Sequence, residues 1–211
     1  MKLDFEKRTK VETGYCLVPQ PHDDLKKYSD LYDRFCSVIY MSVMVGDKPV
    51  KANITREAKD VACIRAALCE LISIEDYIKQ SYPALAFSDY QFYKSQNPIL
   101  HMFKLLRNYN IHLSHSMLGT KPMKVMVPAS LDDVFEIEVE YISNLSVSEL
   151  RRLHSSKDYS DEQLSQMIEC FEVQQHEFGV TTLIIKAALD YSEQITTLLK
   201  VGEIPAHQRH L

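Results

Sequence analysis

The chain has 211 residues, a formal net charge of −5 and 45% hydrophobic residues, which is the balance of an ordinary globular protein. This length favours one helical domain over residues 1–211, and no apolar run approaches the roughly 18 residues that a membrane span needs. Met1–Arg8 has no apolar core of the signal-peptide kind, so we expect a cytoplasmic protein without membrane contact.

The first half of the chain has apolar residues at three- and four-residue steps, which predict amphipathic helices. The predicted helices cover Asp24–Met44, Thr55–Ser81 and Asn97–Gly119. In the first of them, the β-branched run Val38–Val45 also allows a strand. Proline tolerates the first helical turn, so Pro98 suits the start of the third helix, and Gly119 is its predicted C-terminal cap.

Beyond Gly119 the apolar period changes from 3.6 to 2, which indicates strands. Phe135–Tyr141 alternates apolar residues with glutamates, and Met123–Val127 is its predicted partner. We therefore expect a β-hairpin over about residues 123–142, inserted among helices. Its glutamates are predicted to form a solvated face: Glu136, Glu138 and Glu140.

Helical signals return after the hairpin. Ser146 opens a capping box for a short helix through Leu153. Ser160 starts a longer helix, in which Val173 is expected to point inward. A last helix is predicted over Val180–Val201, with Gly202 as its cap and residues 203–211 as a loose tail. The predicted fold class is mainly α, a helical bundle of five or six helices with one inserted β-hairpin.

The sequence offers little support for a metal or cofactor site. Its five cysteines include no C-x-x-C pair, and Cys36, Cys63 and Cys69 lie in apolar helical patterns, so we expect buried, reduced thiols. His112 and His115 are three residues apart, but no Glu or Cys pair follows at helical spacing. Glycine-rich nucleotide loops and G-x-S-x-G elbows do not occur either, so we expect no cofactor.

The strongest candidate site lies on the third predicted helix. Asn108 and His112 are four residues apart and share one helix face, and Arg107 is adjacent. A permanent cation beside an imidazole that titrates near neutrality suits phosphodiester chemistry. Arg107 and His112 are separated by about 140° around a regular helix, so the long arginine side chain has to swing round the flank to reach a shared phosphate.

The segment Leu106-Arg107-Asn108-Tyr109-Asn110-Ile111-His112 resembles the R-x4-6-H signature of the HEPN superfamily, compact helical bundles common in prokaryotic toxin and defence systems. The polar residue after the arginine, Asn108, also matches the family. The resemblance implies a homodimer in which two motifs face one another across a cleft that cuts RNA without a metal. A cognate antitoxin or other protein partner is a further implication. The resemblance to the HEPN superfamily does not cover the β-hairpin.

The resemblance also implies a role for each residue of the motif. His112 would be general base or acid for attack by the ribose 2′-hydroxyl, and Arg107 would hold the scissile phosphate. Asn108 would orient His112 or the phosphate, and the product would be a 2′,3′-cyclic phosphate. Many members of the family lack this activity, so membership alone does not establish catalysis.

Two alternatives stay open. In the first, Arg107 is a solvated residue, His112 is partly buried and hydrogen-bonded, and the helix has only a structural role. In the second, the whole chain is a non-catalytic helical module that binds a protein partner or a nucleotide. The negative net charge favours this alternative, because nucleic-acid-binding domains usually carry a basic face.

Further residues are auxiliary candidates around this motif. His115 is a second group near His112, and Glu75 is placed either to brace Arg107 from a facing helix or to be solvated. An aromatic stretch before the motif helix would stack bases or pack over the bundle end: Tyr82, Phe87, Tyr90, Phe92 and Tyr93. A small basic cluster is expected to be solvated surface: Lys121, Lys124, Arg151 and Arg152.

Overall fold

The computed structural model describes residues 2–15, 17–49, 54–112, 118–126 and 134–201. Within them it confirms a mainly helical bundle with one two-stranded antiparallel hairpin. The long helices are α1 Ser29–Val43, α2 Arg56–Ser81, α4 Pro98–His112, α6 Asp161–Gln175 and α7 Gly179–Val201. The one-turn helices are α3 Phe87–Tyr90 and α5 Val147–Leu150, and the strands are β1 Leu118–Met126 and β2 Val134–Ile142. Short 3-10 turns are η1 Phe5–Lys7, η2 Asp23–Lys27, η3 Phe92–Lys94 and η4 His154–Ser156.

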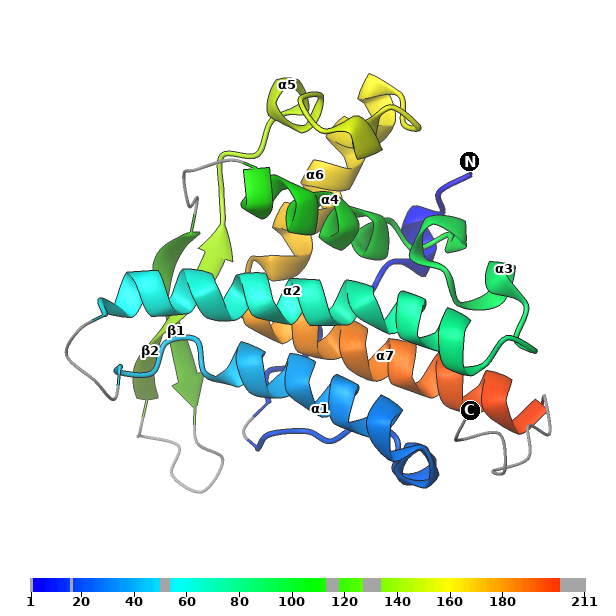
Figure 1. The fold of residues 1–211 in the computed structure, drawn as a ribbon. Coiled ribbons are helices and arrows are strands. Elements are labelled where there is room, and N and C mark those ends of the chain that lie inside the picture. Colours follow the sequence, from blue (N-terminus) through cyan, green and yellow to red (C-terminus); the bar gives the residue numbers. More distant parts are fainter. Residues whose placement is uncertain (1, 16, 50–53, 113–117, 127–133, 202–211) are drawn as a thin grey trace.

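The long helices pack around one apolar core (Figure 1). α2 lies between α1 and α4, α7 packs against α1 and α6, and α6 crosses behind α4. The hairpin lies at one end of the bundle and rests on α7 through β2. No helix within the described residues is both long enough and apolar enough to cross a membrane.

The first predicted helix is divided in two. η2 ends where Tyr28 leaves helical geometry, with φ −120° and ψ 70°, and α1 then begins at Ser29. The ambiguous run Val38–Val45 is helical as far as Val43, because Val38 and Ile39 face the core there. Tertiary burial thus decides between helix and strand.

The capping residues mark most helix starts as predicted. The Thr55 hydroxyl accepts a hydrogen bond from the Ala58 N–H at 3.2 Å and begins α2. Ser160 forms a complete capping box with Gln163 at the start of α6. Ser146 caps α5, but this helix ends at Leu150 and not at Leu153. The expected inward position of Val173 is wrong, since this side chain is 60% exposed.

The junction between α4 and the hairpin corrects the predicted third helix. α4 ends at His112, and β1 begins at Leu118, so Gly119 is a strand residue and not a helix cap. Gly119 pairs with Tyr141 on β2, and a Cβ atom at this glycine would lie 3.0 Å from the tyrosine ring. Glycine is therefore needed for close cross-strand packing under an aromatic ring. The hairpin is correspondingly longer than predicted.

One of the three alternating glutamates is not solvated. Glu136 and Glu138 are exposed, but Glu140 is 4% exposed, and its carboxylate lies beside Arg56, the first residue of α2. There Arg56 contacts Glu138 at 3.0 Å and Glu140 at 3.4 Å. Burial raises the pKa of the Glu140 carboxyl, and the nearby Asp60 carboxylate raises it further. This cluster ties the hairpin to α2.

The described cysteines are free thiols, as predicted, although only Cys170 is fully buried. Burial raises the pKa of the Cys170 thiol to about 11, which makes it unreactive at neutral pH. Cys36, Cys63 and Cys69 are half-buried. Cys16, His115, Gly202 and the predicted tail 203–211 lie outside the described residues.

Candidate functional site

Arg107 and Asn108 lie on the flank of α4, which has one strongly buried side. Asn97 begins this helix by accepting a hydrogen bond from the Ile99 N–H at 3.0 Å, which satisfies one of the free amides of the first turn. Apolar residues at helical spacing then fix the rotation of the helix against the core: Ile99, Met102, Phe103 and Leu106. The next two residues are therefore half-buried at the edge of the bundle.

The side chains of Arg107 and Asn108 are joined by a hydrogen bond. One guanidinium N–H of Arg107 donates to the Asn108 Oδ1 at 3.1 Å, and the Asn108 amide donates to the Ser155 Oγ at 3.0 Å. Asn108 therefore fixes the direction of the arginine while it is itself held by η4. Sequence reasoning missed Ser155, because a lone serine 47 residues away carries no local signal.

The Arg107 guanidinium is incompletely paired by the described part of the protein. Its Nε is buried and has no hydrogen-bond partner among those residues. A buried N–H donor of a guanidinium is unfavourable when it has no hydrogen-bond acceptor. A bound anion would supply the missing acceptor. The arrangement favours an anion-binding role for Arg107 over a purely solvated one.

Arg151, expected to be solvated surface, instead holds η4 in place. Its guanidinium donates to the Ser156 carbonyl at 2.7 Å and to the Tyr159 carbonyl at 2.8 Å, and it pairs with Asp161. Arg152 is exposed, as predicted. The chain of contacts from Asp161 through Arg151 and η4 thus supports Asn108 from outside the helix.

His112 is the last residue of α4, one turn beyond Asn108, so the predicted helical register of the motif is present in the backbone. The side chain of His112, like all of His115, lies outside the described part of the chain. Arg107 and Asn108 are brought together, whereas the contacts of the two histidines stay predictions.

Glu75 faces α4, but its partner is not Arg107. Its carboxylate is 5% exposed, pairs with the Lys104 ammonium at 3.0 Å and accepts the backbone N–H of Phe92. The alternative of a solvated carboxylate is wrong, since a buried carboxylate needs such partners. Glu75 instead places Lys104, which sequence reasoning did not single out, one turn before Asn108 on the same side of α4.

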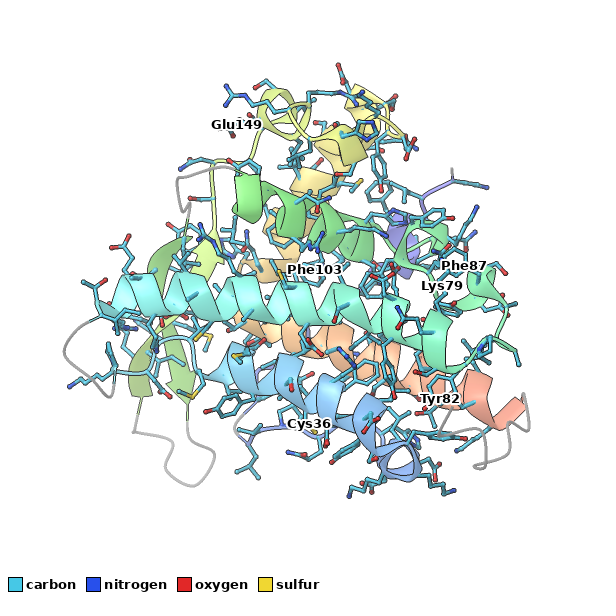
Figure 2. All side chains as sticks on the ribbon, in the orientation of Figure 1. Cys36, Lys79, Tyr82, Phe87, Phe103 and Glu149 are labelled. Atoms are coloured by element: carbon cyan, nitrogen blue, oxygen red, sulfur yellow. The ribbon has the colours of Figure 1, made fainter. Side chains whose placement is uncertain are left out.

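The aromatic stretch before α4 divides into buried and exposed rings. Tyr82, Tyr90 and Phe92 are buried, as the packing alternative predicts. Phe87 and Tyr93 are 39% and 37% exposed and meet edge to face at 6.5 Å between ring centroids. Figure 2 places Phe87 and Lys79 where the end of α2 meets α3.

Three lysines lie over the two exposed rings. Lys79 lies 5.3 Å from the centroid of Phe87, and Lys94 and Lys104 lie 4.9 and 5.3 Å from that of Tyr93. We call Lys79, Phe87, Tyr93, Lys94 and Lys104 the cation–aromatic patch. Exposed rings next to cations are the features with which proteins hold single-stranded nucleic acids. Lys104 continues this patch along α4 toward Asn108, about 6 Å away along the helix axis.

His101 is part of the core and not of the site. It is fully buried, with Nδ1 2.7 Å from the Tyr159 hydroxyl and Nε2 2.8 Å from the Ser95 carbonyl. A neutral ring matches both partners when Nε2 donates to the carbonyl and Nδ1 accepts from the tyrosine. Burial lowers the pKa of His101, so this neutral form persists at pH 7. With both ring nitrogens engaged, His101 is not available as a ligand.

Comparison of the chain with models of known protein families, with curated proteins and with solved structures gave no match.

Proposed function

We propose that the protein is a HEPN-like, metal-independent endoribonuclease of the cytoplasm that acts as a homodimer in a toxin or defence setting. The observation that carries the proposal is the half-buried Arg107 guanidinium, which Asn108 aims and which lacks an acceptor for its Nε among the described residues. Together with His112 one turn further along α4, it matches the residues that a phosphate-cleaving site without a metal requires.

In this proposal His112 accepts the proton of a ribose 2′-hydroxyl as its oxygen attacks the adjacent phosphorus. The bond from phosphorus to the 5′-oxygen breaks, and the protonated His112 of the second copy in the dimer supplies a proton to the leaving oxygen. Arg107 stabilises the charge that develops on the phosphate oxygens. Asn108 acts as a positioning residue for Arg107. The products are a 2′,3′-cyclic phosphate and a free 5′-hydroxyl.

The cation–aromatic patch supports RNA as the substrate. An unpaired strand that stacks bases on Phe87 and Tyr93 would pass Lys104 on its way to Arg107. Although the chain has a net charge of −5, this side of α4 therefore presents a local run of cations.

The experiment is cleavage of single-stranded RNA in EDTA, with mass spectrometry of the product ends. We expect 2′,3′-cyclic phosphate ends from the wild type and at least a hundredfold slower cleavage by Arg107→Ala and His112→Ala. The matched control is Arg34→Ala on α1, which removes a half-buried arginine that pairs with Glu70 at 2.8 Å, far from the site in sequence.

Two results would overturn the proposal. Cleavage that His112→Ala leaves unchanged would exclude the stated general base. Binding of RNA or of a protein partner without cleavage of any RNA would favour the non-catalytic helical module. Circular dichroism of each variant separates a lost reaction from a lost fold.

A further inference from the structure

A polar cavity of about 430 Å³ lies at the opposite end of α4 from Arg107. It is bounded by the N-terminal segment around η1, by the turn between α3 and α4, and by α7. Figure 1 shows this N-terminal segment beside the start of α4. The volume falls in the range of roughly 300–1,000 Å³ that small-molecule sites occupy.

The cavity has an excess of unpaired positive charge. Lys7, Arg8 and Lys94 line it, and no carboxylate among the described residues lies within ion-pair distance of any of them. Of the two acids in the lining, Asp190 is already paired with Lys186. Lys7 donates to the Gln96 side chain, Arg8 donates to the Phe5 carbonyl, and Lys94 lies over Tyr93, but these contacts neutralise no charge. Three cations without a carboxylate partner thus face one acid without a cationic partner among the described residues, which favours an anion in this cavity.

Gln91 is a buried wall of the cavity with an unmet hydrogen bond. The residue is 7% exposed, and its side-chain Oε1 is buried without a hydrogen-bond partner among the residues that the structure describes. Its backbone is fixed, because the Gln91 carbonyl accepts hydrogen bonds from the Lys94 and Ser95 amides at 3.0 and 3.1 Å. The side chain therefore cannot easily withdraw to solvent, and a ligand donor such as a hydroxyl would satisfy it.

The first turn of α4 also faces the cavity through Asn97 and Leu100. This 15-residue helix directs its positive end there, which favours a phosphate group. The first turn lies about 10 Å along the helix axis from Arg107, so the cavity and the proposed reaction site are separate.

We infer that this cavity binds a small phosphate monoester, with the phosphate held by Lys7, Arg8 and Lys94 and a hydroxyl or amino donor of the same molecule on Gln91. Sugar phosphates and nucleotides share this chemistry. The site is separate from the proposed reaction site, since none of its lining residues belongs to the Arg107–Asn108 pair, and it shares only Lys94 with the cation–aromatic patch.

Isothermal titration calorimetry of the full chain tests the inference with ribose 5-phosphate, AMP, inorganic phosphate and adenosine. We expect ribose 5-phosphate or AMP to bind, inorganic phosphate to bind more weakly, and adenosine not to bind. Preference for AMP would identify a nucleotide site, and preference for ribose 5-phosphate a sugar-phosphate site. Calorimetry needs no cleavage, so Arg107→Ala should bind these ligands as the wild type does.

Variants of the lining make the test specific. Arg8→Ala and Lys94→Ala should each raise the Kd about tenfold, because each removes a charged hydrogen-bond donor to the phosphate. Gln91→Leu should raise the Kd of the organic phosphate and leave that of inorganic phosphate unchanged. The control is Lys157→Ala, an exposed lysine outside the cavity.

The inference is overturned if none of the phosphates binds at millimolar concentration. It is equally overturned if Lys157→Ala weakens binding as much as Lys94→Ala, because that result would indicate general attraction to surface charge. Lys94→Ala keeps the test valid if the more buried variants fail to fold, since Lys94 is exposed.

Discussion

The Asn108 side chain donates a hydrogen bond to the Ser155 hydroxyl at 3.0 Å, and so links α4 to η4 across 47 residues of sequence. We expect Ser155→Ala to lower the free energy of unfolding by about 1 kcal/mol, since the amide hydrogen of Asn108 loses its acceptor. Urea denaturation measures this change. Ser165→Ala, at an exposed position of α6, should have almost no effect. In the same Ser155 variant RNA cleavage should slow, because Asn108 no longer fixes Arg107; unchanged cleavage would contradict the positioning role.

Glu75 provides a second test of buried polar contacts. Glu75→Ala leaves the Phe92 amide without an acceptor and Lys104 without its counter-charge, so we expect a loss of about 3 kcal/mol in unfolding free energy. Glu75→Gln keeps an acceptor of the same size and should cost only about 1 kcal/mol. Chemical denaturation of both variants separates the two values. Equal effects would mean that the charge, and not the hydrogen bond to Phe92, accounts for the stability.

His101 predicts a pH dependence of stability. Burial lowers its pKa in the folded state below the ordinary value of 6.5, so the unfolded chain binds the proton more readily. The contribution of this residue to stability is therefore complete above pH 6.5 and is lost as the pH falls below 6.5 toward the folded-state pKa. Thermal unfolding between pH 5 and 8 should show this decline in the wild type. His101→Gln should be less stable at pH 8 but flatter over the acidic range, and a variant with the wild-type slope would exclude His101 as its source.

Gly179 begins α7 in a conformation that other residues adopt at a cost. Its φ is +79°, and a Cβ atom here would lie 2.7 Å from the Glu140 carbonyl oxygen. Gly179→Ala should therefore destabilise the protein by roughly 2 kcal/mol or more, from backbone strain and from displacement of β2. Gly14→Ala is the control, because its Cβ would meet only the Phe178 ring at 3.3 Å. Thermal unfolding of the two variants should differ clearly, and similar losses would argue against the strained geometry.

The cation–aromatic patch leads to a prediction for RNA affinity. Phe87→Ala or Tyr93→Ala should each raise the Kd for single-stranded RNA about tenfold, since base stacking contributes roughly 1–3 kcal/mol per base. Fluorescence anisotropy with a short labelled RNA measures the change. Tyr40→Ala is the matched control, an exposed ring on α1 that is 57% accessible. If all three variants bind equally, this surface does not contact RNA.

Local signals were sufficient to predict most of the helices. Thr55 and Ser160 cap the helices they were expected to cap, because a serine or threonine hydroxyl needs only the next turn to form its bond. The period change at the hairpin is local as well. In contrast, Gly119 resembles a helix cap in sequence, and only the pairing with Tyr141 reveals its role in a strand.

The candidate site was less predictable, because several of its contacts join residues that are distant in sequence. The pairing of Arg107 with Asn108 follows from their adjacency, but Ser155 and Lys104 enter through tertiary contacts that no periodicity records. Glu140 likewise occupies a position of the strand that alternation assigns to solvent, and only the approach of Arg56 makes its burial tolerable. A sequence pattern therefore predicts the wrong environment for residues whose partners are distant in the sequence.

Thr9 and Asn97 form a reciprocal pair, in which the Thr9 amide donates to the asparagine oxygen at 3.2 Å and the asparagine amide donates to the threonine hydroxyl at 2.9 Å. The same asparagine oxygen caps α4. The first residues of the chain therefore dock on the start of α4 across a sequence separation of 88 residues, which has an entropic cost of loop closure. They should detach without unfolding the bundle, as a separate opening unit in hydrogen exchange. A ligand seated against Lys7 and Arg8 would slow exchange in this segment first, while the core helices exchange at their own rate.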